Sequence, residues 1–454
     1  MDFLIILAIQ FSLMIVGFLF SISLGIKNKI ESLGISYLLG SALITILFLI
    51  NHIFFELSLG PINFLISIAF SSVLFFLYLN VYKKEKSIFK IDFIKINQLI
   101  KSLNCFEKFI VITLIFIFLY TLFENYYWPV TDWDSLALYD FRARVMAING
   151  NMLEGVELGY FFQYPPYTSF LHLFGYIFGD ERVRIVYSFI YFSLIATFYS
   201  LLRRTQLRWI TLIGSLMLSV DTFIFRHSTM AYTNLSYVVF LSLGLIYLSF
   251  WFLFSKKKDF LVGAMLVGLS TWVRASDPFW YIGILIIIAG TIKNKKNYLL
   301  SLGAILGSVG IYKFWDYFVK GINITSDASS RETRYLDSIM NNNGVILKII
   351  QTLPEIIIYF SNNLFYVIGY LIPIFFISIY YDLKNKNKLN IFLYIVVGVS
   401  IVLILVGIII FSLFYDTWNQ IADSLQRLSM VLIPLMIFLI FNSEAWKSQD
   451  VKNK

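Results

Sequence analysis

The sequence predicts an all-α polytopic membrane protein, and two observations carry this prediction. Of the 454 residues, 59% are hydrophobic and only 14% are charged, whereas ordinary soluble domains carry about 25% charged residues. Apolar segments long enough to cross a bilayer recur along the whole chain. Together these features exclude a soluble globular protein, a disordered chain and a coiled coil.

Thirteen apolar, charge-poor segments have about the length that a transmembrane helix needs. In chain order they are 3–25, 35–55, 61–82, 109–126, 184–202, 209–225, 234–254, 260–274, 278–292, 297–315, 357–381, 390–412 and 428–442. Another apolar stretch, 166–178, is too short to span comfortably. We therefore predict about thirteen transmembrane helices, with a juxtamembrane or half-buried helix at 166–178.

Basic connectors between these segments set the orientation. They are Lys27/Lys29, Lys83 to Lys108, Arg203/Arg204/Arg208, Lys256–Lys258, Lys293–Lys296, Lys384–Lys388 and Lys447–Lys454. All fall on one side only if 166–178 does not cross, and the positive-inside rule makes that side cytoplasmic. The prediction is a protein of the cytoplasmic membrane with its N-terminus outside and its C-terminus inside. The net charge of +9 then reflects topology and does not indicate a nucleic-acid partner.

The cysteine and histidine content argues against a built-in metal centre. Cys105 is the single cysteine, which excludes an intramolecular disulfide framework and a cysteine-based zinc site. The three histidines, His52, His172 and His227, lie far apart in the chain. No cofactor is indicated, and a divalent metal stays an open alternative.

Charges on the predicted outer side favour chemistry at the outer membrane interface. Among the basic residues of the outer segments arginine predominates, and its planar guanidinium binds phosphate or carboxylate through two hydrogen bonds. Ionisable residues also avoid the middles of the spans, which argues against an ion-driven carrier. For any single outer arginine, an ion pair with a nearby aspartate is the alternative.

The first long outer loop, 127–166, begins with an acidic segment directly after a span. It contains Asp132-Trp133-Asp134, and Thr131 or Asp132 could cap a helix that follows. In an extended segment Asp132 and Asp134 share one face. The pair could therefore supply a general base or bind a metal, while the alternative is a helix cap and an ion pair with a nearby arginine.

A helix from Ser135 to Asn149 is predicted next. It would be amphipathic and lie along the membrane surface, and Gly150 would end it. The loop closes with Tyr164-Pro165-Pro166, in which Pro166 suits a first helical position. The second long outer loop, 317–345, contains Arg331 and Arg334 and could act as a lid.

The order of these motifs resembles the GT-C-type membrane glycosyltransferases, in particular the bacterial branch related to family 39. That family carries an acidic motif after a span, then a juxtamembrane helix, then an aromatic Pro-Pro segment. Here they read Asp132-Trp133-Asp134, Phe141-Arg142-Ala143-Arg144 and Tyr164-Pro165-Pro166-Tyr167. Gly263 to Arg274 and Arg427-Leu428 resemble the family's glycine-rich helix and its arginine before the last span. The resemblance covers about 110–290 well and the C-terminal half loosely.

The resemblance implies three regions. Residues 1–108 are accessory N-terminal helices with a basic cytoplasmic loop, 109–316 are the GT-C-like core, and 317–454 hold the second outer loop and the C-terminal helices. Two positions depart from the family pattern, because Ser135 and Asn234 stand where many members carry acids. These departures weaken a metal-binding interpretation.

The resemblance also implies an activity, namely transfer of a sugar from a polyprenyl-phosphate donor to an extracytoplasmic glycan, lipid or protein acceptor. It makes Asp134 the catalytic base, with Asp132 as the alternative. Candidates for binding the donor phosphate are Arg274, Arg427, Arg226 and His227. Residues expected to contact acceptor or donor from the loops are Trp133, Tyr139, Arg142, Arg144, Tyr164, Arg331 and Arg334.

Three other functions stay open at this point. An O-antigen polymerase or ligase is also polytopic and relies on outer-loop arginines, although its large loop usually comes late in the chain. A lipid or oligosaccharide transporter is a second alternative. A non-catalytic scaffold derived from the transferase fold is the third, since Ser135 and Asn234 replace acids.

Overall fold

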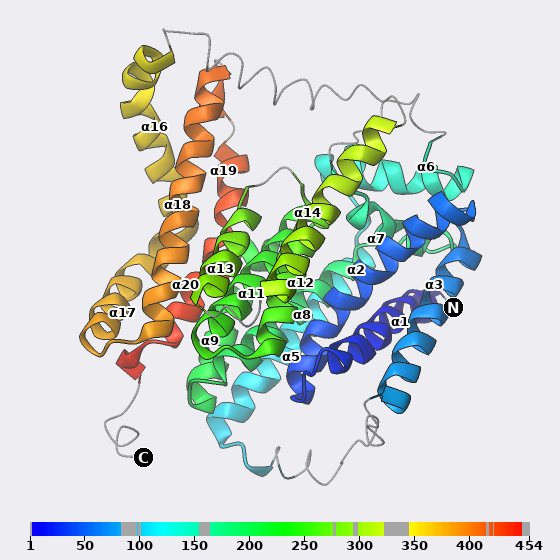
Figure 1. Ribbon diagram of the computed structural model, residues 1–454, viewed down its shortest axis with the longest axis horizontal. Coiled ribbons are helices and arrows are strands. Elements are labelled where there is room, and N and C mark those ends of the chain that lie inside the picture. Colours follow the sequence, from blue (N-terminus) through cyan, green and yellow to red (C-terminus); the bar gives the residue numbers. More distant parts are fainter. Residues whose placement is uncertain are drawn as a thin grey trace. The chain divides into compact units, whose positions relative to one another are not determined.

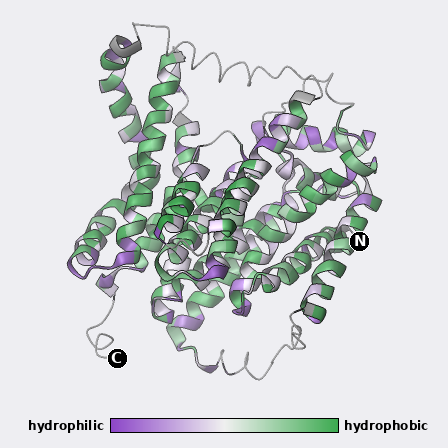
Figure 2. Ribbon diagram, in the orientation of Figure 1, coloured by the Kyte–Doolittle hydropathy of each residue, from purple (hydrophilic) through white to green (hydrophobic). Residues whose placement is uncertain are grey.

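The computed structural model describes residues 2–82, 98, 101–153, 164–275, 278–293, 298–321, 345–414, 417–420 and 422–446. Within these ranges the chain forms helices and no strand, so the all-α prediction is confirmed. Among the described residues, ten helices are long and apolar enough to cross a membrane. Figure 2 shows hydrophobic residues along the long helices and hydrophilic residues at their ends and on α6 (Phe141–Asn149). These helices fit an integral multi-pass membrane protein.

The three other predicted spans lie on shorter helices. These are α9 (Arg208–Val220), α12 (Lys257–Val273) and α13 (Trp280–Lys293). Each of the thirteen predicted segments therefore lies on helical chain, although not all of these helices have the length of a full span.

The chain divides into two compact units, the first made of 1–160 and 166–239 and the second of 161–165 and 240–454. The first unit contains α1 (Asp2–Ser23), α2 (Lys29–Phe55), α3 (Pro61–Leu77), the π-helix η1 (Tyr78–Tyr82), α5 (Cys105–Tyr127), the π-helix η2 (Ser135–Asp140), α6, α7 (Tyr167–Tyr176), α8 (Ile185–Leu202), α9, α10 (Thr222–His227) and the start of α11 (Thr233–Phe254).

Two glycines let α1 and α2 pack closely. A Cβ atom at Gly17 would lie 1.7 Å from the carbonyl oxygen of Ser36, and one at Gly40 would lie 1.8 Å from that of Leu13. Small residues at such contacts are typical of transmembrane helix pairs. Since α2 also packs against α7 and α8, the N-terminal helices form one unit with the two helices that follow the loop 127–166.

The short helix α7 is buried within the fold. Every residue from Tyr167 to Gly175 is buried, because α7 packs against α1, α2, α6 and η2. Its predicted place at the membrane surface, without crossing, stays a prediction. Burial of Phe170, Leu171, Leu173 and Phe174 stabilises the helix, and its polar side chains Ser169, His172 and Tyr176 have hydrogen-bond partners. Pro166 occupies the N-cap position, so the helix begins one residue later than predicted.

The predicted span 209–225 ends early. The helix α9 stops at Val220, and Asp221 then accepts a hydrogen bond from the backbone N–H of Ile224 at 2.9 Å. An aspartate that binds a backbone N–H favours the start of a helix over its interior. The last residues of the predicted span therefore form the separate short helix α10.

The second unit contains the rest of α11 and the C-terminal helices. These are α12, α13, α14 (Tyr298–Gly321), α16 (Val345–Ile368), the 3₁₀ turn η5 (Gly369–Leu371), α17 (Ile372–Lys384), α18 (Lys388–Phe414), the 3₁₀ turn η6 (Trp418–Gln420), α19 (Ala422–Ser429), α20 (Leu432–Phe441) and the 3₁₀ turn η7 (Glu444–Trp446). The predicted span 357–381 is interrupted by η5. Pro373 cannot donate a backbone hydrogen bond and its ring clashes with the carbonyl four residues earlier, so the α-helix breaks there.

A buried carboxylate ties three parts of the second unit together. Asp382 accepts hydrogen bonds from Asn390 Nδ2 at 2.6 Å, from Tyr394 OH at 2.6 Å and from the backbone N–H of Glu444 at 2.8 Å. The donors are neutral groups on α18 and η7, while Asp382 itself lies on α17. Such a carboxylate stabilises the fold only while its donors stay in place.

Candidate functional site

The acidic segment follows α5 as predicted, but its two aspartates do not share an extended strand. The chain leaves α5 at Trp128 in an extended conformation, and it is already helical at Trp133 and Asp134. Asp134 has helical dihedral angles and takes the N-cap position of η2 without a side-chain capping bond. Asp132 and Asp134 are both half-buried, whereas Trp133 is 79% exposed.

The helix predicted from Ser135 to Asn149 is confirmed, with its first part wound as the π-helix η2. Residues Arg142, Ala143, Val145 and Met146 form its buried face. Gly150 ends it at φ 64°, and its N–H bonds the carbonyl of Met146. Figure 1 shows α6 lying crosswise at the end of α2, where the backbone N–H of Leu59 bonds the carbonyl of Gly150 at 2.7 Å.

A buried polar cluster joins η2 and α6 to α7 and α8. Asp140 is 1% exposed, and its carboxylate accepts hydrogen bonds from Arg144 Nε at 2.8 Å and Tyr176 OH at 2.5 Å. His172 Nδ1 lies 3.1 Å from the same carboxylate, and His172 Nε2 lies 3.0 Å from Tyr187 OH. Burial alone would raise the pKa of Asp140, but the hydrogen bond and charge of His172, with the bonds from Arg144 and Tyr176, lower this pKa well below its usual range.

The two loop arginines both contact protein groups. Arg142 is buried, and its Nε donates to Ser169 Oγ at 2.8 Å. Arg144 lies over the Tyr176 ring, 4.7 Å from the ring centre, while its side chain stays 46% exposed. Arg142 therefore joins α6 to α7, and of the two only Arg144 has substantial contact with the surroundings.

A second buried arginine, Arg184, ties the acidic segment to the start of α11. The residue is 6% exposed, and its guanidinium donates to the carbonyls of Pro129, at 2.9 Å, and Thr229. Burial lowers the pKa of Arg184, although the negative charges of Asp132 and Glu124 act against this shift. These two hydrogen bonds, which we call the Arg184 clamp, hold together two segments that are far apart in sequence.

Two further hydrogen bonds join the same segments. Asn125 Nδ2, near the end of α5, donates to the carbonyl of Ser228 at 2.8 Å. Tyr139 OH lies 3.1 Å from Thr233 Oγ1. The chain from Asn125 to Tyr139 is thus held against 228–233 at three points.

Arg226 and His227 directly precede this tethered segment. Both lie in the last turn of α10. Arg226 is exposed, whereas His227 is buried and its Nδ1 lies 2.9 Å from the carbonyl of Phe223. The structure therefore brings these two predicted phosphate ligands to the same end of the first unit as Asp132 and Asp134.

The other predicted ligands belong to the second unit. Arg274 lies just after α12, with its guanidinium 5.4 Å from the centre of the Tyr164 ring. Arg427 on α19 forms an ion pair with Asp423, with Nε 3.1 Å from Oδ2. Arg331 and Arg334 lie outside the described residues.

Metal ligands are not gathered in the part of the chain that the structure describes. No group of three or more histidine, cysteine, aspartate or glutamate side chains there could hold a metal ion. The acidic segment, the arginines and the aromatic side chains are thus the chemical groups from which a site can be built.

Sequence reasoning missed His172, Ser169, Tyr176 and Arg184. Three of these carried a readable signal, since Ser169, His172 and Tyr176 are spaced three and four residues apart and share one face of a helix. A polar stripe on an otherwise apolar short helix predicts a buried polar partner. Arg184 gave no comparable local signal, because its acceptors are backbone carbonyls.

Comparison with known proteins gives no relative: no family model, curated protein or solved structure matches the chain.

Proposed function

We propose that this protein is a GT-C-like glycosyltransferase, which moves a sugar from a polyprenyl-phosphate donor to an acceptor on the extracytoplasmic side of the cytoplasmic membrane. The reacting groups would lie at the end of the first unit that carries Asp132, Asp134, Arg226 and His227. The proposal also includes about thirteen transmembrane helices. It places this end of the first unit on the extracytoplasmic side.

One observation carries it, namely the clamp that Arg184 forms between Pro129 and Thr229. Sugar transfer from a lipid phosphate needs a carboxylate for the acceptor and cations for the leaving phosphate. The clamp and the two bonds beside it hold an acidic segment next to the basic end of α10. Because all these groups belong to one unit, the proposal favours Arg226 and His227 over Arg274 and Arg427 as phosphate ligands.

The proposed step is a displacement at the anomeric carbon of the sugar. Asp134 takes the proton of the acceptor hydroxyl, a bond forms from that oxygen to the anomeric carbon, and the bond from this carbon to the phosphate oxygen breaks. The polyprenyl phosphate leaves with the electron pair. Arg226 stabilises the charge that develops on the phosphate, and His227 assists by hydrogen bonding.

The surrounding residues suit this chemistry in two ways. Trp133 is exposed between the two aspartates, and an exposed indole can stack on a sugar face or sit at the membrane interface. The Asp140 cluster holds η2 and α6 in place beneath the acidic segment. Asp140 is then a positioning residue, because it is buried and fully engaged by its partners.

A transfer assay tests the proposal. The purified protein in lipid vesicles would receive polyprenyl-phosphate-linked hexoses and pentoses with a labelled sugar, together with a membrane extract as acceptor. Asp134→Asn should abolish transfer, Asp132→Asn should reduce it less, and the exposed Glu355→Gln on α16 should behave as the unmodified protein.

One result would change the assignment of the base, and two would speak against the proposal. Full activity in Asp134→Asn with loss only in Asp132→Asn would exchange their roles. Passage of the intact donor across the vesicle membrane without sugar transfer would indicate a transporter. Extension of a glycan chain from a lipid-linked oligosaccharide donor would indicate a polymerase.

A further inference from the structure

An elongated cavity of about 370 Å³ lies inside the first unit, away from the acidic segment. Its lining comes mainly from α5, α8 and α9, with Ile30 from α2 and Leu103 from the chain before α5. Almost all of its lining is apolar. A water-filled catalytic site would need polar partners along its walls, so this cavity calls for an apolar occupant.

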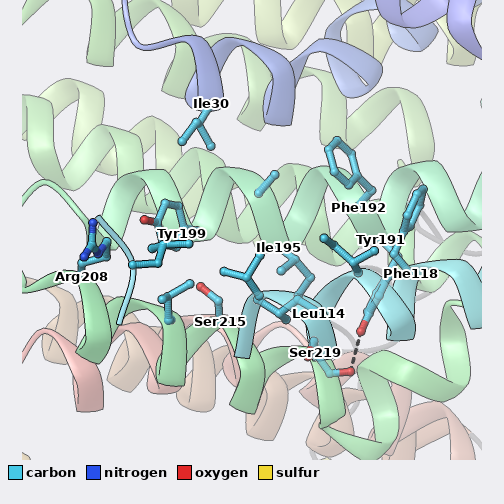
Figure 3. Close-up of a pocket in the computed structure, with 15 residues that line it drawn as sticks. Ile30, Leu114, Phe118, Tyr191, Phe192, Ile195, Tyr199, Arg208, Ser215 and Ser219 are labelled. Atoms are coloured by element: carbon cyan, nitrogen blue, oxygen red, sulfur yellow. Dashed lines mark hydrogen bonds between the residues drawn. The ribbon is translucent and has the colours of Figure 1, made fainter. Parts of the chain in front are cut away.

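Each of the three helices lines the cavity with one face. The lining residues recur at helical spacing: Val111, Leu114, Ile115 and Phe118 on α5; Phe192, Ile195, Ala196 and Tyr199 on α8; Leu212, Ser215 and Ser219 on α9. Seven residues of helix rise by about 10 Å, so each row is that long. Figure 3 shows Arg208 and Tyr199 at one end of the cavity and Tyr191 with Phe118 at the other. The shape fits a linear chain.

The cavity opens toward the surroundings of the helices. Ile30 and Ile115 on its edge are exposed, and only four residues of α5 are buried, namely Glu107, Ile110, Thr121 and Asn125. In a membrane the exposed face of such a helix meets lipid. A lipid chain can therefore enter from the side.

The end of the cavity at Arg208 has a strongly basic rim. The described residues there include Lys27, Lys29, Lys101, Lys108, Arg203, Arg204 and Arg208, against the acids Glu31 and Glu107. Both acids are already paired, with Arg204 bound to Glu31 at 2.5 Å and Arg208 bound to Glu107 at 2.7 Å. The same two pairs hold the starts of α2, α5 and α9 together with the end of α8, so the rim is one surface.

We infer that the cavity holds an acyl chain of an anionic phospholipid, with the lipid phosphate at the basic rim. The apolar walls alone select little, because bilayer lipid is as apolar as they are. Shape and rim charge supply the selection, since basic side chains near the membrane surface attract anionic headgroups. By the positive-inside rule this lipid belongs to the cytoplasmic leaflet, and the inference does not depend on the proposed transferase activity.

Mass spectrometry of the intact protein, released from vesicles of equal dioleoyl phosphatidylglycerol and dioleoyl phosphatidylcholine, tests the inference. The unmodified protein should retain about one phosphatidylglycerol. Ala196→Phe fills the cavity and should lose this lipid, whereas Ala69→Phe, on the exposed face of α3 in the same unit, should keep it.

A second pair of double variants tests whether the basic rim selects the anionic headgroup. Lys101→Gln with Lys108→Gln should lower the ratio of bound phosphatidylglycerol to phosphatidylcholine by up to about thirtyfold, at about fivefold per lysine. Lys384→Gln with Lys386→Gln removes the same charge elsewhere and should leave the ratio unchanged. Higher salt should weaken the preference in the unmodified protein.

The inference would be overturned by retention of phosphatidylglycerol by Ala196→Phe, or by equal retention of both lipids by the unmodified protein. Recovery of an isoprenoid phosphate in place of the phospholipid would assign the cavity to the lipid donor and would also reject it. If Ala196→Phe does not fold, the unmodified protein can be crosslinked to a phosphatidylglycerol with a photoreactive acyl chain, and the crosslinked residues identified. Crosslinks on the lining faces of α5, α8 or α9 support the inference, and crosslinks only elsewhere reject it.

Discussion

His172 Nδ1 lies 3.1 Å from the carboxylate of Asp140, although the two residues are 32 positions apart in the chain. The contact fixes α7 against the junction of η2 and α6. Because His172 also reaches Tyr187 on α8, three elements meet at one buried imidazole. The position of the first outer loop therefore depends on this polar cluster.

Asp140→Asn should destabilise the protein far more than Asp423→Asn. Both aspartates pair with an arginine four residues later, but Asp140 is 1% and Asp423 is 74% exposed at the side chain. Breaking a buried ionic network costs about 3 kcal/mol, whereas an exposed pair contributes at most about 1 kcal/mol. Thermal unfolding of both variants in one detergent measures the difference. Equal losses would show that the Asp140 cluster adds no stability through its burial.

The contribution of Asp140 should vanish in acid. Its pKa in the folded protein is lowered, so its stabilisation is fully present above the usual carboxyl pKa of about 3.9 and is lost as the pH falls through that value toward the folded pKa. The gap in unfolding temperature between the unmodified protein and Asp140→Asn should be fully present at about pH 5. It should shrink below about pH 4. A gap that widens in acid would contradict this assignment.

Arg184→Lys should impair transfer although it keeps the positive charge. A lysine ammonium cannot reproduce the planar fork that reaches both Pro129 and Thr229. We expect the rate of proteolytic cleavage near Asp132 to rise and kcat/KM to fall by about tenfold or more, since a hydrogen bond to a charged group contributes about 1.5–3 kcal/mol. Arg203→Lys, at an exposed site, is the control. Unchanged proteolysis and activity in Arg184→Lys would remove the clamp from the proposal.

Removing the charge of Arg226 should reduce kcat/KM about ten- to a hundredfold, because the leaving phosphate gains charge in the transition state. Arg427→Gln should have little effect, since that guanidinium is already paired with Asp423. Arg274→Lys keeps a cation near Tyr164 and should also be mild. Loss of activity in the last two variants, with Arg226→Gln unaffected, would place the donor phosphate in the second unit.

The native cysteine allows a direct test of orientation. Cys105 is exposed at the start of α5, on the predicted cytoplasmic side. A membrane-impermeant maleimide should label it only after the cells are opened. In a Cys105→Ser background, Thr131→Cys at the other end of α5 should be labelled on intact cells. The reverse pattern would invert the topology and place the proposed site inside.

Local signals made much of the first outer loop predictable. The apolar run of α5, the acidic segment after it, the helix to Asn149 and its end at Gly150 all depend on residues close together in sequence. The partners of that helix were not predictable, because they come from α7 and α8. Arg142 shows the difference: its position on the helix was expected, but its burial against Ser169 depends on how two helices pack.

Span ends were harder to predict than spans. Hydropathy averages over many residues, so it passes through Asp221 and through the break before Pro373, where single residues end a helix. In both places a backbone hydrogen-bonding constraint decides the structure. Such constraints act on one residue and leave the average hydropathy nearly unchanged.

The hydrogen bonds of the Asp382 carboxylate are completed only by residues that are synthesised much later than Asp382 itself. Its last donor, the backbone of Glu444, is synthesised 62 residues after it. Until then the nascent protein holds a buried acid whose set of donors is incomplete, so the C-terminal helices cannot reach their final packing one by one. A chain that stops just before Glu444 would retain every helix from α1 to α20 and still lack this bond. Such a truncated chain should unfold at a lower temperature than the full-length protein, although the two differ by only a short tail, because the buried carboxylate lacks one of its donors.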